Sequence, residues 1–257
     1  MPALPDRHAI EDAARIVHAA MPPTPQYAWP QLAQALGTEV WVKHENHTPV
    51  GAFKVRGGLV YFDGLARRAD RPAGVIGATR GNHGQSMAFA ARRTGMRCVV
   101  VVPRANSREK NTAMRALGAE IVEHGEDFQA AREHAAELAQ AEQLHYVPSF
   151  HADLVRGVAT YWAEFFHAVP DLDVVYVAAR NVYAPQTRIV GGVSAHARCY
   201  ALSVAAGRAI EAPVTTQLAD GLACRVPDAE SLAIIRAHVT RIVEVTDVEV
   251  AAAMRSR

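Results

Sequence analysis

The sequence lacks the features that mark a membrane, secreted or nucleic-acid-binding protein. Its longest purely aliphatic stretch is Val99–Val102, far shorter than the roughly 20 residues of a membrane-spanning helix. Residues 1–8 contain no apolar run of the kind found in signal peptides. Charge of one sign is also missing, because 27 Lys and Arg face 26 Asp and Glu, a formal net charge of +1. We therefore expect no general attraction to nucleic acid or to an anionic membrane, and any anionic ligand needs a local site.

Cysteine is scarce, and histidine, although frequent, has no metal-binding pattern. Cys98, Cys199 and Cys224 are odd in number and widely spaced, so they predict neither a disulfide framework nor a zinc site. The 12 histidines show no HExxH or similar ligand spacing. These absences favour a reducing, cytoplasmic setting.

What the sequence does contain is an alternation of short β-rich runs with amphipathic helices. The predicted strands are Glu39–Lys43, Val75–Ala78, Cys98–Val102, Glu120–Glu123, Asp173–Val177 and Thr187–Gly192. The predicted helices are Ala9–Met21, Gln85–Thr94, Ser107–Leu117, Asp127–Ala141, Asp153–Ala168 and Asp247–Met254. Strands separated by helices predict an α/β fold with parallel sheets and right-handed crossovers.

Two sheets fit this pattern better than one. Residues 73–147 contain four strand–helix units and predict a small domain. The flanking residues 1–72 and 148–257 then form a second, larger and discontinuous domain.

One connection does not fit the alternation. Only residues 178–186 separate the predicted strands Asp173–Val177 and Thr187–Gly192, whereas a βαβ crossover needs roughly 10–12 residues or more. No loop residue stands between Val177 and the helical Ala178. We interpret this as a missing segment.

The first candidate for chemistry is Lys54. It lies in the stretch 43–58, which leaves a strand, turns at Pro49 and Gly51, and enters a helix. A lysine packed against Phe53 with few acidic neighbours can be desolvated, and desolvation lowers the pKa of an amine and suits it to Schiff-base chemistry. Taken alone, Lys54 also fits a solvated lysine at the start of a helix.

The second candidate is the turn 77–85, Gly-Ala-Thr-Arg-Gly-Asn-His-Gly-Gln, which follows a buried strand. A strand-to-helix turn rich in glycine presents free backbone N–H groups, and the helix dipole favours an anion there. A carboxylate suits a loop this short, with further donors from Thr79 and Arg80. The turn lacks the GxxxxGK[ST] and GxGxxG patterns of nucleotide sites, and standing alone it also fits an ordinary βα turn.

Together, the two stretches resemble one family. Gly-Ala-Phe-Lys at 51–54, followed by Thr-Arg-Gly-Asn-His-Gly-Gln at 79–85, is similar to fold-type II pyridoxal-phosphate enzymes of the threonine/serine dehydratase (threonine ammonia-lyase) and serine racemase branch. The likeness continues through Pro103–Lys110, Arg115–Glu120 and Ala219–Ala223. It implies an α/β, two-domain parallel-sheet fold of the tryptophan synthase β-like kind, with a shortened large domain.

The resemblance implies a role for each matching residue. Lys54 matches the lysine that bonds pyridoxal 5'-phosphate and later moves the substrate Cα proton. Phe53 matches the residue packed beside the cofactor ring, and Asn82 matches the asparagine that hydrogen-bonds the cofactor 3-hydroxyl. The loop that binds the substrate carboxylate contains Thr79, Arg80, Gly81 and His83.

The implied reaction is β-elimination, which deaminates L-threonine to 2-oxobutanoate, or L-serine to pyruvate, with release of ammonia. Racemases of the family have a serine where this chain has Arg80. An arginine stays charged and is a poor base, so dehydration is favoured over serine racemase-like chemistry. Threonine, serine and a related hydroxy amino acid such as hydroxyaspartate stay open as substrates. The family also suggests a homodimer.

Some relatives bind a divalent metal through carboxylates in the region that corresponds to Gly192–Arg198. That stretch contains no carboxylate here, so we expect no such metal.

The chain departs from the family in two further places. The glycine-rich loop that holds the cofactor phosphate directly after the strand Asp173–Val177 is absent. The sequence also stops at Arg257, inside a predicted helix, where relatives continue with a residue that contacts the pyridine nitrogen. Three interpretations follow: a normal enzyme whose printed sequence lacks residues, a truncated and cofactor-deficient homologue with poor activity, or a non-catalytic protein that binds amino acids or a partner.

Overall fold

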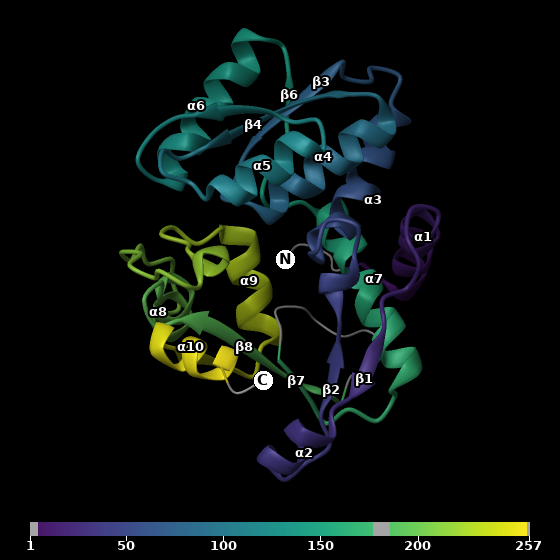
Figure 1. Cartoon of the computed structure of the whole chain (residues 1–257), viewed down its shortest axis with the longest axis vertical. Coiled ribbons are helices and arrows are strands. Elements are labelled where there is room, and N and C mark those ends of the chain that lie inside the picture. Colours follow the sequence, from purple (N-terminus) through teal and green to yellow (C-terminus); the bar gives the residue numbers. More distant parts are fainter. Residues whose placement is uncertain (1–4, 177–185, 256–257) are drawn as a thin grey trace. The chain divides into compact units, whose positions relative to one another are not determined.

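A computed structural model describes residues 5–176 and 186–255 of the chain. Residues group by their contacts into two compact units, Pro5–Ala168 and Val169–Arg257. We call them the N-terminal unit and the C-terminal unit. Both consist of helices and strands in alternation (Figure 1).

The N-terminal unit is built around a four-stranded parallel sheet. Its strands are β3 (Gly74–Ala78), β4 (Arg97–Val102), β5 (Glu120–Glu123) and β6 (His145–Tyr146), in the order β5-β4-β3-β6. The strands β3 and β4 are almost wholly buried, as expected of parallel strands covered on both faces. All four strands lie within the segment 73–147.

Helices cover both faces of this sheet. They are α3 (Lys54–Ala66), α4 (Asn82–Thr94), α5 (Arg108–Ala116) and α6 (Phe128–Ala141). On one face, Val100 of β4 packs in a core with Met87 of α4 and Phe62 of α3. On the other, Val99 packs with Ala131 and other small residues of α6. The alternation of side chains along β4 therefore feeds two separate cores.

A helical layer next to the sheet consists of α1 (Arg7–His18), α3 and α7 (Ala152–Ala168). Its core includes Ala13 and Val17 of α1 with Val55 and Val60 of α3. The helix α1 begins after Asp6, whose carboxylate accepts a hydrogen bond from the Ala9 N–H at 2.8 Å, the usual role of an N-cap aspartate.

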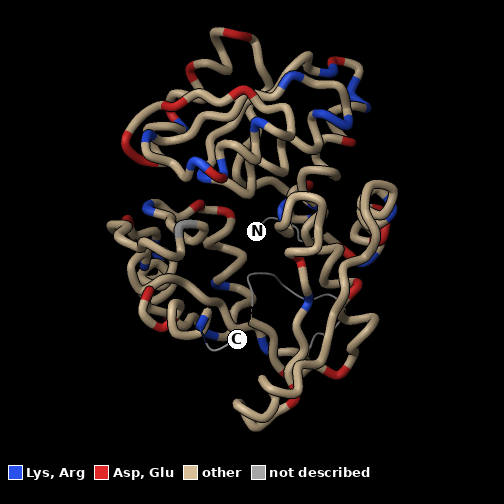
Figure 2. The backbone as a smooth tube through the Cα atoms, viewed as in Figure 1, with Lys and Arg blue, Asp and Glu red and all other residues tan. Residues whose placement is uncertain are grey.

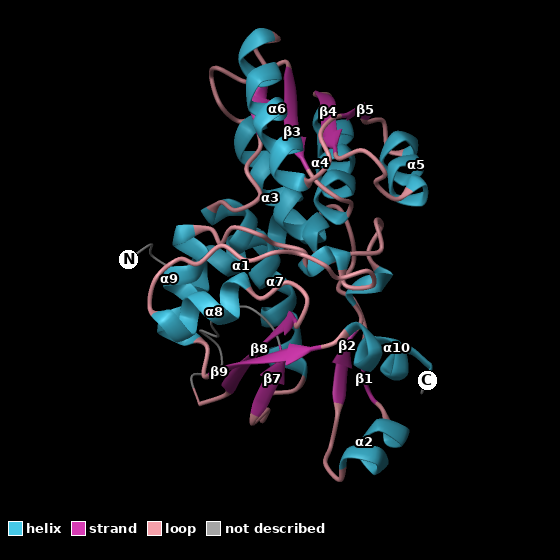
Figure 3. Cartoon of the chain, turned by 90° about the vertical axis from the view of Figure 1, so that its left-hand side faces the viewer, coloured by secondary structure: helices cyan, strands magenta, loops and turns pink. Residues whose placement is uncertain are grey.

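The C-terminal unit has a second parallel sheet. Its strands are β7 (Val174–Tyr176), β8 (Arg188–Ser194) and β9 (Arg241–Val245), in the order β7-β8-β9. Its helices are α8 (Cys199–Ala206), the short 3-10 helix η2 (Asp220–Leu222), α9 (Ala229–His238) and α10 (Asp247–Arg255). Figure 3 shows the three strands side by side.

The parallel α/β fold expected from the sequence is thus confirmed, with one addition. The strands β1 (Gln26–Ala28) and β2 (Trp41–Lys43) form a two-stranded antiparallel sheet, and α2 (Pro30–Leu36) lies between them in the sequence. A 3-10 helix η1 (Glu45–His47) follows. The two parallel sheets that the sequence predicted are present, and this hairpin forms a third, antiparallel sheet. The strand β2 lies within the predicted strand Glu39–Lys43, whereas β1 and α2 were not predicted. Both are short, and α2 has no buried residue, so no hydrophobic periodicity marked them.

The division into a 73–147 domain and a domain of 1–72 with 148–257 stays a prediction. The short connection at residues 178–186, where a segment is expected to be missing, lies outside the described residues except for its last residue. Charged residues of both signs are interspersed along both units (Figure 2). No helix among the described residues is long and apolar enough to cross a membrane.

Candidate active site

Lys54 is the first residue of α3, and a tight turn fixes the chain in front of it. Gly51 has a φ of 66°, in the left-handed region that glycine adopts without strain. The Thr48 hydroxyl accepts a hydrogen bond from the Ala52 N–H at 2.9 Å and donates one to the Ala52 carbonyl at 3.0 Å. The turn that the sequence predicted at Pro49 and Gly51 therefore sets where α3 begins.

The Lys54 amine is desolvated by the protein around it. Burial lowers the pKa of this amine, and no charged side chain contributes to the shift. A lysine with a lowered pKa has a larger uncharged fraction near neutral pH, and only the uncharged amine is a nucleophile or a base. The lowered pKa is the property that the sequence analysis expected of this residue.

The helices α3 and α4 lie in close contact next to Lys54. The Ser86 hydroxyl donates a hydrogen bond to the Lys54 carbonyl oxygen at 2.7 Å. A Cβ atom on Gly58 would lie 2.2 Å from the Ser86 hydroxyl, so only glycine permits this approach. Lys54 is thereby held beside the first turns of α4, which follow the predicted carboxylate loop.

The loop from Thr79 to Gly81 connects β3 to α4. Thr79 is buried, and its hydroxyl accepts a hydrogen bond from the Gly81 N–H at 3.0 Å. No side chain caps α4, whose N-cap residue is Gly81. The first backbone N–H groups of a helix have no intrahelical acceptor, and the helix dipole adds positive potential there. The start of α4 is therefore suited to an anion such as a carboxylate.

Two polar atoms of this loop are buried without a partner. Among the described residues, Arg80 Nε and His83 Nε2 have no hydrogen-bond acceptor or donor. Burial, and secondly the charge of Lys54, lowers the pKa of His83 to about 3, although a hydrogen bond with the Pro148 backbone raises it. His83 is therefore neutral at physiological pH. Buried unpartnered polar atoms are rare and call for an explanation, and a polar ligand would supply one here.

The remaining predicted site residues, Asn82 and Phe53, also lie at the starts of helices. Asn82 is the first residue of α4 and is exposed. Phe53 directly precedes α3, is 38% exposed, and makes an edge-on contact with Tyr161 at a ring-centroid distance of 6.2 Å. The structure thus brings the predicted site residues of the N-terminal unit to the starts of two adjacent helices, α3 and α4.

Sequence reasoning missed the buried charge network behind Lys54. Arg56 is 0% exposed. Its guanidinium donates to Glu45 at 2.7 and 2.9 Å and to Glu164 at 2.6 and 3.0 Å. The Lys43 ammonium also bonds Glu164, at 2.7 Å. Burial opposes ionisation of Glu164, but the Arg56 hydrogen bonds outweigh it and lower the Glu164 pKa to about 2. No local pattern marks this network, because Glu164 lies far from Arg56 in the sequence.

Some predictions concern other parts of the chain. The expected absence of a glycine-rich loop concerns the chain directly after Val177, where residues 177–185 lie outside the described residues. Gly192–Arg198 lies at the end of β8 and in the turn before α8, and no cluster of potential metal ligands occurs among the residues that the structure describes.

The described residues fit the reactive end of pyridoxal phosphate. An aldehyde needs an uncharged amine, which the desolvated Lys54 supplies. The exposed part of the Phe53 ring and the Asn82 amide lie on the adjoining helix starts, where a flat aromatic ring with a polar substituent could contact both. The fold and this site define a class: α/β proteins with a half-buried, desolvated lysine beside an uncapped helix start.

Comparison with known proteins agrees with this class. The family model of pyridoxal-phosphate dependent enzymes matches residues 17–256. The chain belongs to this family, whose cofactor is pyridoxal 5'-phosphate.

Similar curated proteins are threonine dehydratases. The chain is 29% identical over 261 residues to the biosynthetic L-threonine dehydratase of Haemophilus influenzae, covering 96% of this chain and 51% of that protein. It is 33% identical over 237 residues to an L-threonine ammonia-lyase of Geobacter sulfurreducens, covering 87% of this chain and 58% of that one. The chain thus spans about half the length of these relatives.

Solved structures share the fold. The processed form of threonine deaminase isoform 2 from Solanum lycopersicum matches with a TM-score of 0.83 and 25% identity, covering 99% of this chain and 79% of that one. A pyridoxal 5'-phosphate-dependent aspartate racemase matches with a TM-score of 0.91 at 24% identity, covering 99% of this chain and 84% of that one, which supports the fold alone. The fold is therefore that of fold-type II pyridoxal-phosphate enzymes.

Proposed function

We propose that this chain is a pyridoxal-phosphate-dependent ammonia-lyase that deaminates L-threonine to 2-oxobutanoate and ammonia, with L-serine as a second substrate. The observation that carries the proposal is the desolvated Lys54 amine beside the uncapped start of α4. The similarity to threonine dehydratases over most of this chain supports the choice of substrate.

Each residue of the site has a task in this reaction. Lys54 would hold the cofactor, and its amine would take the proton from the substrate Cα, because the lowered pKa leaves the amine free to accept it. When bound, pyridoxal phosphate supplies an electron sink for the pair left at that carbon. Asn82 would hold the cofactor ring by a hydrogen bond, and Phe53 would pack beside it.

The loop Thr79–His83 orients the substrate. Its backbone N–H groups at the start of α4 bind the carboxylate, with Arg80 adding a positive charge. Neutral His83 places a buried imidazole near Lys54 without adding a second cation, which keeps the lysine pKa from falling further. With the substrate carboxylate fixed at the start of α4 and the substrate amine beside α3, the substrate Cα proton is directed towards Lys54. Arg80 is a permanent cation and a poor second base, which favours elimination over racemisation.

We further propose that residues 73–147 form a small domain and that residues 1–72 and 148–257 form a large one. We also propose that the chain forms a homodimer. Its proposed location is the cytoplasm. The self-contained sheet within 73–147 supports the first proposal. The family resemblance supports the second. Sedimentation of the purified chain would test the oligomeric state.

The chain's lysines offer a direct test of the cofactor site. Lys43, Lys54 and Lys110 are the only lysines in the sequence. We expect pyridoxal phosphate, added to the purified chain and reduced with borohydride, to be trapped on Lys54, because Lys43 is already bonded to Glu164. Peptide mapping by mass spectrometry reads the site, and Lys54→Ala should lose both the trapped product and ammonia release from threonine.

The possible outcomes separate the candidate functions. Trapping on Lys54 with release of 2-oxobutanoate supports the lyase. Threonine binding that survives Lys54→Ala without turnover indicates a non-catalytic amino-acid-binding homologue. Labelling spread over Lys43 and Lys110 as in the mutant would refute a cofactor site at Lys54.

A further inference from the structure

A cavity of about 730 Å³ lies in the N-terminal unit, lined by residues of α1, α3, α4 and α7. The helix α3 contributes residues from Leu59 to Arg67, whereas Lys54 is at the opposite end of that helix. Neither Lys54 nor the loop Thr79–His83 is among the lining residues. The cavity is therefore separate from the candidate active site. Its volume is within the range of small-molecule sites, roughly 300–1,000 Å³.

The lining carries an excess of positive charge. It contains four arginines, Arg15, Arg67, Arg93 and Arg156, and two acids, Asp12 and Asp63. This local excess stands out in a chain whose formal net charge is +1. An anionic ligand needs such a local site, because the molecule as a whole has no attracting field.

Three of the four arginines are already paired with a carboxylate. Arg15 bonds Asp12, Arg67 bonds Asp63 at 2.8 Å, and Arg156 bonds Asp153 at 3.1 Å. These pairs compensate the positive charge of three of the four guanidinium groups.

Arg93 differs from the other three. Its guanidinium carbon lies 5.9 Å from the centre of the Phe89 ring, and no carboxylate partner of Arg93 occurs among the described residues. The side chain is exposed. Arg93 is therefore the arginine of this lining that is available to an incoming anion.

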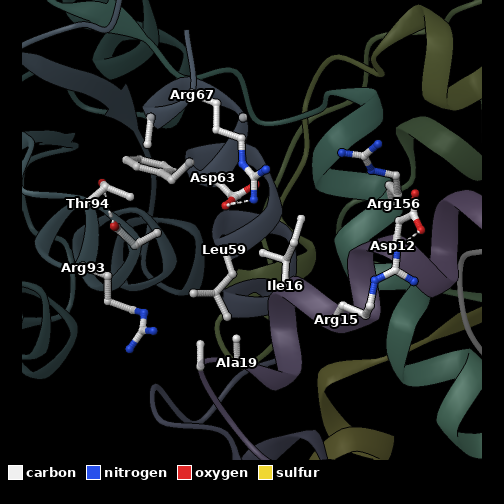
Figure 4. Close-up of a pocket in the computed structure, with 15 residues that line it drawn as sticks. Asp12, Arg15, Ile16, Ala19, Leu59, Asp63, Arg67, Arg93, Thr94 and Arg156 are labelled. Carbon is white, nitrogen blue, oxygen red and sulfur yellow. Dashed lines mark hydrogen bonds and ion pairs between the residues drawn. The ribbon is translucent and has the colours of Figure 1, made fainter.

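Apolar side chains occupy the space between the charged groups. Figure 4 shows Leu59, Ile16 and Ala19 between Arg93 on one side and Arg15 with Arg156 on the other. A ligand that spans this cavity would contact hydrocarbon in the middle and a guanidinium at an end. A wholly polar anion would leave the apolar part in water, and a neutral hydrocarbon would leave Arg93 without a partner.

We propose that this cavity binds a small amphiphilic carboxylate, with the carboxylate on Arg93 and the hydrocarbon body on Leu59, Ile16 and Ala19. The planar guanidinium offers two parallel N–H donors, which match the two oxygens of one carboxylate. The hydrocarbon body gains from leaving water against the apolar side chains. This site is independent of the proposed lyase function.

The test uses the full chain and sodium hexanoate as the probe, with methyl signals of Ile16 and Leu59 followed by NMR. We expect hexanoate to shift both signals in a saturable manner. Two matched probes separate the contributions: inorganic phosphate has the charge without the hydrocarbon, and hexan-1-ol has the hydrocarbon without the charge. Each should bind at least about tenfold more weakly than hexanoate, a difference that titration resolves readily.

Neighbouring arginines provide a matched pair of variants. Arg93→Gln should weaken hexanoate binding at least about fivefold, because a charge-assisted bond is lost. Arg92→Gln changes the next residue of the same helix, which does not line the cavity, and should alter the affinity by less than about twofold.

Three results would overturn the proposal. The first is that hexanoate leaves the Ile16 and Leu59 signals unchanged. The second is that Arg93→Gln and Arg92→Gln weaken binding equally. The third is that Arg93→Gln changes the sedimentation of the chain, which would make this surface an interface between copies. Since neither pyridoxal phosphate nor threonine is added, none of these results bears on the lyase function.

Discussion

At the scale of single residues, Arg56 connects the chemistry of the site to its stability. It lies two positions after Lys54 in α3, and its side chain is fully buried between Glu45 and Glu164. A buried ion pair adds little over a well-packed apolar pair, but removal of one partner strands the other charge. The network therefore stabilises the first turn of α3, and substitution of one of its charged residues should lower the stability of the fold.

We expect Arg56→Met to destabilise the chain by about 3–5 kcal/mol, because Glu45 would lose its cation and Glu164 would lose one of the cations that bond it. The measurement is urea unfolding followed by circular dichroism. The control is Arg97→Met, which also removes an arginine bonded to two carboxylates, Glu120 and Glu142. Because Arg97 is exposed at the surface, its loss should cost much less stability than the loss of Arg56. Equal losses in the two variants would contradict this account.

At the scale of elements, glycines decide how closely α3 packs against α7. A Cβ atom on Gly157 of α7 would lie 2.3 Å from the Arg56 carbonyl oxygen and 2.7 Å from the Gly57 Cα. Both are backbone atoms, which cannot rotate away. This close approach lets Thr160 and Glu164, on the same helix, reach the Arg56 guanidinium.

Gly157→Ala should therefore separate α3 from α7 and destabilise the chain by about 1–3 kcal/mol, the usual cost of overpacking. Gly64→Ala, on α3, is the matched control, because its nearest neighbour would be Asp153 Oδ2 at an ordinary 3.9 Å. Alanine is about 1 kcal/mol better than glycine inside a helix, so this variant should be neutral or stabilised. Thermal unfolding of both variants measures these changes in stability. An unchanged stability in Gly157→Ala would contradict this account, because it would show that α7 can shift away from α3 at no cost.

At the scale of the whole molecule, the candidate site and the main cores belong to one unit. The three hydrophobic clusters lie within the N-terminal unit. So do Lys54, the loop Thr79–His83 and the Arg56 network. A unit with its own core can fold alone.

We expect a fragment of residues 5–168 to unfold cooperatively and to keep the lowered pKa of Lys54. The pH dependence of Lys54 labelling by fluorodinitrobenzene, mapped by mass spectrometry, measures that pKa in the fragment and in the full chain. Matching pH profiles would support the prediction. A fragment without cooperative unfolding would show that the C-terminal unit is needed to hold the site.

Much of this protein could be predicted from local sequence. The buried strands β3 and β4 were evident because Gly74–Ala78 and Arg97–Val102 are almost continuously apolar. Lys54 and the turn before α4 were marked by glycines at fixed positions. The predicted strand Glu39–Lys43 contains β2, but its partner β1 was missed because it is three residues long, too short for a period to show.

What the sequence by itself determined is local: the α/β alternation, the family, and which residues stand at the two helix starts. These follow from periodicity, turn chemistry and short motifs, which act between neighbours in the chain. Only the tertiary structure decided that Glu45 and Glu164 enclose Arg56, that burial lowers the Lys54 pKa, and that arginines of four helices line one cavity. Those properties depend on contacts between segments far apart in sequence, and the burial and charge around a group exist only once the chain has folded.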